Sequence, residues 1–247
     1  MGSALSISGP NIVINTIVAE SLGRLADRLE GCADARAALP SVIGETFEAH
    51  RRILFNGNSY SDEWVQEAAE RGLPNLENAA DALPYFVSAK NIELFTKNGI
   101  FTEHEMRSRC EILMGGYAKA INIEALTMLE IARAQILPAA SEYCGRLSLS
   151  AARQRALSPD LACHAERSLA SRISKLSDSL YGKIESLEQA LLDAKGMGGD
   201  AMACAKLCRE SVFIAMQELR AVADEMETLV GRKSWPFPCY GDLLFSV

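Results

Sequence analysis

Apolar residues recur every three or four positions along almost the whole chain, and this spacing predicts helices. Near the N-terminus, Pro10 occupies a typical first helical position. Apolar residues then repeat up to Gly31, at Ile14, Ile17, Val18, Leu22, Leu25 and Leu29. The pattern predicts an amphipathic helix with one buried stripe. No stretch sustains the two-residue alternation of a strand, so we expect an all-α fold with almost no sheet.

Capping and turn residues divide the next part of the chain. A second helix is predicted to begin between residues 33 and 41 and to end at the turn 56–58. Ser61 can cap a short helix that ends before Gly72, and residues 83–95 read as a single helical segment after a loop through residues 75–81. Thr102 and Glu105 form a capping box, which predicts the start of a long helix.

This long helix is predicted to bury one stripe and to end near Pro138. Pro138 must kink or break it, because proline has no amide proton and clashes with the preceding turn. The apolar positions that keep the helical period are Met106, Cys110, Leu113, Tyr117, Ile121, Leu126, Leu129 and Ile136.

The remaining chain is predicted to form an antiparallel helical hairpin over residues 159–230. A helix restarts at Ser158-Pro159-Asp160, and residues 196–200 must reverse the chain. The first helix has the mixed spacing of a coiled-coil seam at Leu169, Ile173, Leu176, Leu180, Ile184, Leu187 and Leu191. The tail from Trp235 contains two prolines and is expected to pack as irregular chain on the bundle.

Composition narrows the function classes. The 247-residue chain has a formal net charge of -7, and its basic residues are interleaved with acids, which is not the pattern of a surface for nucleic acid or anionic membrane. No apolar run approaches the length of a membrane-spanning helix. The seven cysteines are an odd number scattered through helical patterns, so we interpret them as reduced thiols in the cytoplasm.

The sequence gives only weak evidence for a metal site or a phosphate-binding site. The positions three residues before His50, His104 and His164 are not glutamate, which excludes the usual di-iron signature and leaves surface or capping roles. Cys204 and Cys208 lie one helical turn apart, but zinc needs four ligands and no second pair exists, so a buried core role is favoured. The glycine-rich turn at 196–199 lacks the lysine and hydroxyl of a phosphate-binding loop.

Three further features of the sequence allow more than one interpretation or a simple structural one. Gly115-Gly116 inside the long helix suggests close approach of a neighbouring backbone, then a local bend, then a ligand contact. Trp64 and Tyr60 flank the cap at Ser61 and either anchor the turn or face a partner subunit. The acidic positions of the short helix read as a solvated face; these are Glu63, Glu67 and Glu70.

Three segments resemble one enzyme family, the type III glutamine synthetases. They are the segment from Asn56 to Leu76, the segment from Ile121 to Pro138, and the closing Trp-Pro-Phe-Pro-Cys-Tyr-Gly-Asp-Leu-Leu-Phe from Trp235. The resemblance covers nearly the whole chain and is strongest at residues 7–20, 47–138 and 228–245. All three segments look like the helical C-terminal portion of such an enzyme.

The resemblance implies a parent enzyme that joins ammonia to glutamate with ATP and Mg²⁺ or Mn²⁺, in ring-shaped oligomers. In the family, a Phe-Glu-Phe-Arg strand supplies a metal-binding carboxylate and an arginine near the phosphoryl group, and this chain lacks that motif. The resemblance therefore transfers no catalytic, cofactor-binding or metal-binding residue to this chain.

The resulting expectation is a fragment with four parts. Residues 1–31 would end the catalytic domain, 32–158 form a helical region, 159–231 the hairpin, and 232–247 the tail. Its role would be structural, with the rest of a glutamine synthetase and neighbouring subunits as partners. If so, part of the apolar stripe at residues 10–29 has lost the sheet it covers, and is exposed or self-associated.

Two other classes of function remain. One is a free-standing helical scaffold that binds another protein through its hairpin, without catalytic activity. The other, less favoured, is a helical ligand-binding or redox enzyme that uses the cysteines.

Overall fold

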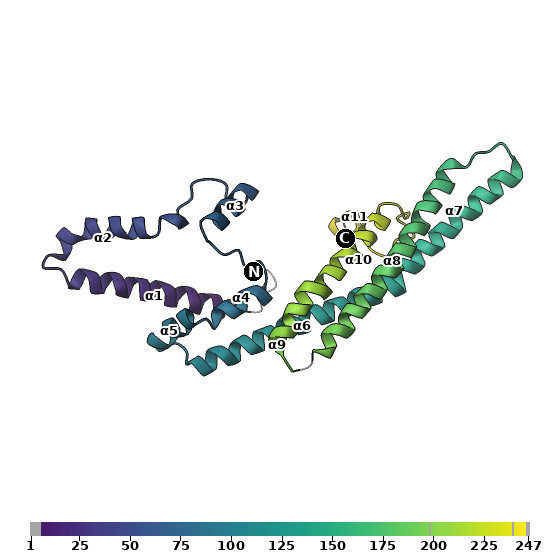
Figure 1. The fold of residues 1–247 in the computed structure, drawn as a ribbon. Coiled ribbons are helices and arrows are strands. Elements are labelled where there is room, and N and C mark those ends of the chain that lie inside the picture. The colour runs from purple at the N-terminus through teal and green to yellow at the C-terminus, as the bar shows by residue number, and fades with distance from the viewer. Residues whose placement is uncertain (1–5, 198, 239, 246–247) are drawn as a thin grey trace. The chain divides into compact units, whose positions relative to one another are not determined.

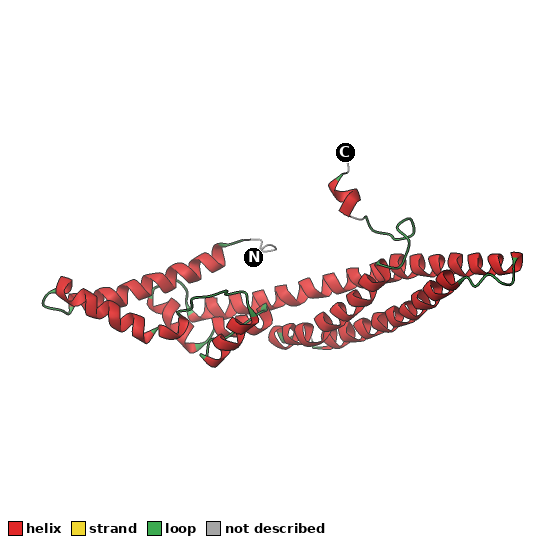
Figure 2. Ribbon diagram, turned by 90° about the horizontal axis from the view of Figure 1, so that it is seen from above, coloured by secondary structure: helices red, strands yellow, loops and turns green. Residues whose placement is uncertain are grey.

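The computed structural model describes residues 6–197, 199–238 and 240–245, and every regular element within them is helical (Figures 1 and 2). The predicted all-α class is confirmed. The chain divides into two compact units, Met1–Ile112 and Leu113–Val247, with the boundary inside one long helix. No helix in the described ranges combines the length and apolarity needed to cross a membrane.

The first unit is a series of helices. Its elements are α1 (Ser8–Glu30), α2 (Ala35–Ala49), the 3₁₀ turn η1 (Arg51–Ile53), α3 (Asp62–Glu70), α4 (Ala79–Phe86), α5 (Ala89–Lys97) and the start of α6 (Glu103–Ile131). Of these, α2, α3 and α4 have side-chain N-caps. The Ser61 hydroxyl accepts a hydrogen bond from the backbone N–H of Trp64, as predicted. The capping box is also confirmed, since Thr102 and Glu105 each accept the other's backbone N–H.

One predicted helix is two helices. Residues 83–95 are divided between α4 and α5, because Ser88 is extended (φ −65°, ψ 151°) at the start of α5. The side chain of Asn91 also donates to the carbonyl of Tyr85 across this break, at 2.7 Å. Moreover, α4 begins within the predicted loop 75–81, where the Asn78 side chain accepts the Asp81 amide.

The second unit is built around one long central helix. It contains the rest of α6, the π-helical turn η2 (Ala132–Ile136), α7 (Leu137–Leu157), α8 (His164–Gly196), α9 (Ala201–Leu207), the π-helical turn η3 (Cys208–Val212), α10 (Phe213–Glu227) and α11 (Tyr240–Leu244). Helix α8 packs against both α7 and α10 (Figure 1). The core comes from one face of each, with Ile173, Leu180, Ile184 and Leu187 of α8 fully buried.

Ion pairs give the direction of α8 against α10. Arg172 pairs with Glu225 at 2.7 Å, and Lys183 pairs with Glu218 at 2.8 Å. Numbers rise along α8 as they fall along α10, so the two helices run antiparallel. The residues of the predicted hairpin thus pack together, and α7 packs along α8 as well.

Pro138 does not break its helix. The chain stays helical from Glu103 to Leu157, and the π-helical turn η2 lies immediately before the proline. Proline cannot donate to the carbonyl four residues earlier, so a local change in hydrogen-bond spacing relieves the conflict at this point. Of the two predicted alternatives, a kink or a break, the break does not occur, and the π-helical turn is the local distortion found at this point.

One other boundary and one buried face also differ from expectation. Helix α8 begins at His164, later than the predicted restart at 158–160, after Cys163 takes a left-handed conformation (φ 48°). Leu113 and Leu126 are exposed, although the pattern assigned them to the core. The buried stripe of α6 uses Met114, Ala118 and Ala125 in their place, and the two small alanines permit close helix packing.

The tail was predicted only in part. Trp235 and Phe237 pack on the core of the second unit, as expected. The chain then forms the short helix α11, which the two prolines had argued against. An ion pair between Arg232 and Asp242 connects this helix to the chain that precedes it.

Replacing Leu180 with alanine should lower the free energy of unfolding of the second unit by about 2–5 kcal/mol, because the side chain is fully buried in the core. Leu192→Ala on the same helix is the matched control, since that side chain is 63% exposed. Urea unfolding followed by circular dichroism measures both changes. Equal losses of stability in the two variants would contradict this description of the core.

Candidate functional site

Helix α1 places its polar side inward and its apolar side outward. Its buried residues are Thr16 and Glu20, whereas Ile14, Val18 and Leu22 are 58%, 49% and 62% exposed. Since an α-helix turns once in about 3.6 residues, these three lie on the side opposite Thr16 and Glu20. The prediction of a buried stripe was thus wrong for Ile14, Ile17, Val18 and Leu22, whereas Leu25 and Leu29 of the same stripe are half-buried. Part of the stripe is exposed, as the fragment hypothesis expected.

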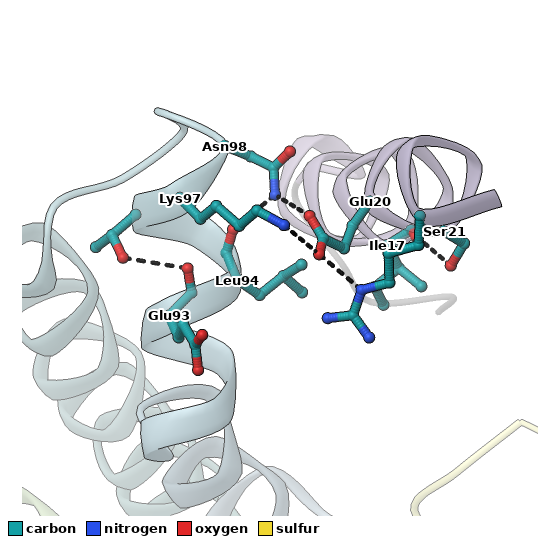
Figure 3. Close-up of polar contacts among 9 residues, drawn as sticks. Ile17, Glu20, Ser21, Glu93, Leu94, Lys97 and Asn98 are labelled. Carbon is teal, nitrogen blue, oxygen red and sulfur yellow. Dashed lines mark hydrogen bonds and ion pairs between the residues drawn. The ribbon is translucent and has the colours of Figure 1, made fainter. Parts of the chain in front are cut away.

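Glu20 holds the polar side of α1 against the end of α5 (Figure 3). Its carboxylate accepts from Lys97 Nζ at 2.9 Å, from Asn98 Nδ2 at 3.0 Å and from Arg24 Nε at 2.8 Å. Lys97 and Asn98 end α5, and Asn98 also donates to the carbonyl of Leu94. The four side chains form a cluster, named here the Glu20 cluster, that fixes the rotation of α1 about its axis.

The electrostatics of this cluster stabilise the ionised carboxylate. The hydrogen bond from Lys97 lowers the pKa of Glu20 most, followed by those from Arg24 and Asn98, and the pKa falls from 4.5 to about 2. Partial burial opposes this shift but is outweighed. The sequence analysis missed Glu20; the available signal was its spacing of four residues from Arg24 on one helix.

Helix α2 buries the apolar Val42 and joins α1 through a surface ion pair. This ion pair is formed by Arg28 and Glu45. The pKa of the Glu45 carboxyl is lowered by the Ser41 hydroxyl and by Arg28. The apolar residues that remain exposed on α2 are Leu39, Ile43 and Phe47. Both helices of this pair therefore present apolar side chains that the first unit does not cover.

The three histidines have surface or capping positions, as predicted. His50 ends α2, His104 lies in the first turn of α6 and His164 begins α8; all three are exposed. Within the described ranges, no group of three His, Cys, Asp or Glu residues could hold a metal ion.

The cysteine pair belongs to the core, as predicted. Cys208 is buried, and Cys204 packs against the same cluster. Burial, and next the nearby Cys204, raise the pKa of Cys208 to about 11, which disfavours the reactive thiolate. Cys239 lies outside the described residues, as does Gly198 of the turn predicted at 196–200.

Gly115-Gly116 does not mark a close approach. A Cβ atom at either position would meet no neighbouring atom within 4 Å, so the first interpretation of this pair was wrong. The two aromatic residues beside the Ser61 cap, Trp64 and Tyr60, differ in their surroundings. Trp64 anchors the turn by stacking on Phe55 with 4.1 Å between ring centroids, whereas Tyr60 is 96% exposed.

The acidic positions of α3 are only partly a solvated face. Glu63 and Glu70 are exposed, in agreement with the sequence interpretation. Glu67 is half-buried and forms an ion pair with Arg71. That pair belongs to an arginine-rich region that the sequence analysis did not identify.

Comparison with known proteins agrees with the resemblance in the sequence. Residues 38–155 match the family described as "Glutamine synthetase C-terminal domain". The chain is 39% identical to a glutamine synthetase of Butyrivibrio fibrisolvens over 214 residues, which is 87% of this chain and 30% of the relative. It is 32% identical to the type-3 glutamine synthetase of Dictyostelium discoideum over 99% of this chain and 34% of the relative.

A third relative shows the same proportion. The glutamine synthetase of Bacteroides fragilis is 26% identical over 99% of this chain and 35% of its own length. The chain thus spans about a third of the length of the curated relatives it matches.

Replacing Glu20 with glutamine should loosen α1 from α5, because the amide keeps the shape but not the charge that Lys97 and Arg24 contact. Hydrogen exchange of α1 amides should become faster at pH 7. Glu30→Gln, at an exposed position of the same helix, is the matched control and should leave exchange unchanged.

The pH dependence has a definite sign. A carboxyl whose pKa is lowered by folding stabilises the fold fully above its unfolded value, and that stability is lost as pH falls toward the folded value. In the natural chain, protection of α1 should therefore decline between about pH 4.5 and 2 beyond any decline in Glu20→Gln. Identical pH profiles for the two proteins would rule out the proposed role of the Glu20 cluster.

Proposed function

We propose that this chain is the helical support of a type III enzyme. The premise is that the chain belongs to the glutamine synthetases and corresponds to their C-terminal region. In this proposal the chain packs on the part of the enzyme that carries the active site and contributes to contacts between subunits. The observation that carries the proposal is the exposed apolar stripe of α1, formed by Ile14, Ile17, Val18 and Leu22.

The rotation of α1 supports a docking role for the stripe. If nothing else covered α1, the unit would be more stable with the apolar side chains of this helix turned toward its core. Here the Glu20 cluster and the buried Thr16 occupy the inner side, so the apolar side faces outward. Contiguous exposed apolar residues commonly mark a protein interaction site, and the relatives are about three times as long as this chain. The preceding portion of such an enzyme is the natural occupant.

The reaction of the parent enzyme would be the ATP-dependent ligation of ammonia to glutamate, with Mg²⁺ or Mn²⁺. The described residues do not fit such a metal, because they contain no group of three potential acidic, cysteine or histidine ligands. We therefore place the nucleotide and metal on the rest of the enzyme and derive no catalytic step from this chain. We further propose a cytoplasmic location, in keeping with the unpaired thiols.

The purified chain should show no glutamate-dependent hydrolysis of ATP when it is incubated with Mg²⁺, ammonia and glutamate. Release of inorganic phosphate measures this directly, and the full-length Butyrivibrio fibrisolvens relative serves as the positive control. Turnover above a no-enzyme blank would show that the chain carries catalytic residues of its own.

Replacing Val18 with aspartate should weaken binding to the portion of the Butyrivibrio relative that precedes the matched region, because a charge would enter the apolar interface. A loss of about 2–4 kcal/mol of binding free energy is the expected scale. Ala19→Asp is the matched control, since that exposed neighbour points about 100° away around the helix. Isothermal titration calorimetry measures both affinities.

The same titration separates the two leading functions. A support of the enzyme binds the preceding portion, and binding depends on Val18. A scaffold for some other protein does not bind it at all, and the unaltered chain would then give no heat above dilution.

A further inference from the structure

Three arginines of the first unit line one open cavity of about 550 Å³. Two of them, Arg51 and Arg52, belong to the 3₁₀ turn η1, and the third, Arg71, follows α3. Leu54 completes the lining. This region coincides with the segment that resembles the enzyme family most closely, yet neither the docking surface of α1 nor the fold of the second unit uses it.

Arg71 shapes the cavity by fixing its backbone. Its Nη1 atom donates to the carbonyls of Leu54 at 2.8 Å and Arg52 at 3.2 Å, and its Nη2 atom pairs with Glu67. Carbonyl oxygens carry partial negative charge and would repel an anion in the cavity. Because Arg71 already binds two of them, it both rigidifies η1 and reduces this repulsion.

An aromatic stack holds Arg71 in place. The guanidinium carbon lies 5.5 Å from the centre of the Trp64 ring, which stacks in turn on Phe55. Gly57 is required beside this stack, because a Cβ atom there would lie 2.6 Å from the Phe55 ring. The stack therefore accounts for Gly57 and Trp64, and it places a fluorescent side chain beside Arg71, which lines the cavity.

The positive charges are only partly compensated. Glu67 pairs with Arg71, and Glu48 approaches Arg51 at 3.9 Å between exposed side chains, a contact worth little in water. The guanidinium of Arg52 makes no hydrogen bond or ion pair with any residue in the described part of the chain. Among the residues that line the cavity, none is acidic.

We infer that this arginine cavity binds a phosphate group, through Arg51 and Arg52, on a frame held by Arg71 and Trp64. Guanidinium groups present several N–H donors in a planar fork that matches the oxygens of phosphate. The cavity is large enough for a free phosphate ion or for the phosphate of a larger ester, such as a nucleotide. This inference does not depend on the docking role of α1.

Fluorescence of Trp64 provides the test. The background variant is Trp235→Phe, which leaves Trp64 as the single tryptophan. It removes no hydrogen bond found in the described part of the chain, because the Trp235 indole N–H has no partner there. Inorganic phosphate, adenosine monophosphate and acetate are titrated separately at constant ionic strength. Saturable quenching by phosphate or the nucleotide is expected, and the tighter of the two identifies the source of the phosphate group.

The variant that tests the assignment is Arg51→Gln/Arg52→Gln. Both side chains are exposed, so the fold should be retained, which circular dichroism checks. Affinity for phosphate should fall about tenfold or more, as expected for the loss of charged hydrogen bonds. Arg36→Gln, an exposed arginine of α2, is the matched control and should bind as before.

Three results would overturn the inference. They are the absence of saturable binding by either phosphate compound, equal affinity in the double variant and the Arg36 control, and binding of acetate as tight as that of phosphate. The last result would show an unselective cationic surface.

Discussion

The hydrogen bonds of Glu20 are the constraint on which the functional account depends. They hold the side of α1 that carries Thr16 and Glu20 inward, and so they determine which side of the helix remains outside. The apolar residues Ile14, Val18 and Leu22 then stay largely exposed among the described residues of their unit. A charged contact that would be a minor feature on many helices here decides which apolar side chains remain exposed.

The second unit has a different physical basis. Its stability comes from the fully buried face of α8, packed between α7 and α10, with ion pairs such as Arg172–Glu225 at the margins. Apolar burial of this kind needs no ligand and no metal. The two π-helical turns, η2 and η3, change the helix geometry locally without interrupting the core.

Local signals in the sequence predicted most of the fold. Capping residues such as Ser61 and Thr102 act within one helical turn, so their neighbours along the chain contain the whole signal. The extra helix α4 had such a signal too, at Asn78, which was overlooked. The continuity at Pro138 could not be read in this way, because a π-helical turn depends on how the helix packs.

The candidate sites were less predictable, because they depend on contacts between distant segments. Periodicity showed that α1 has an apolar stripe, but it could not show whether the chain itself covers that stripe. Lys97 lies 77 residues from Glu20, and Arg71 lies 17 residues from Leu54, so neither contact leaves a local pattern.

Hydroxyl-radical footprinting of residues 14–22 tests the central claim most directly: the account predicts strong labelling of the isolated chain and protection when the preceding portion of the relative is added. Weak labelling of the isolated chain, or labelling that the added portion leaves unchanged, would contradict it.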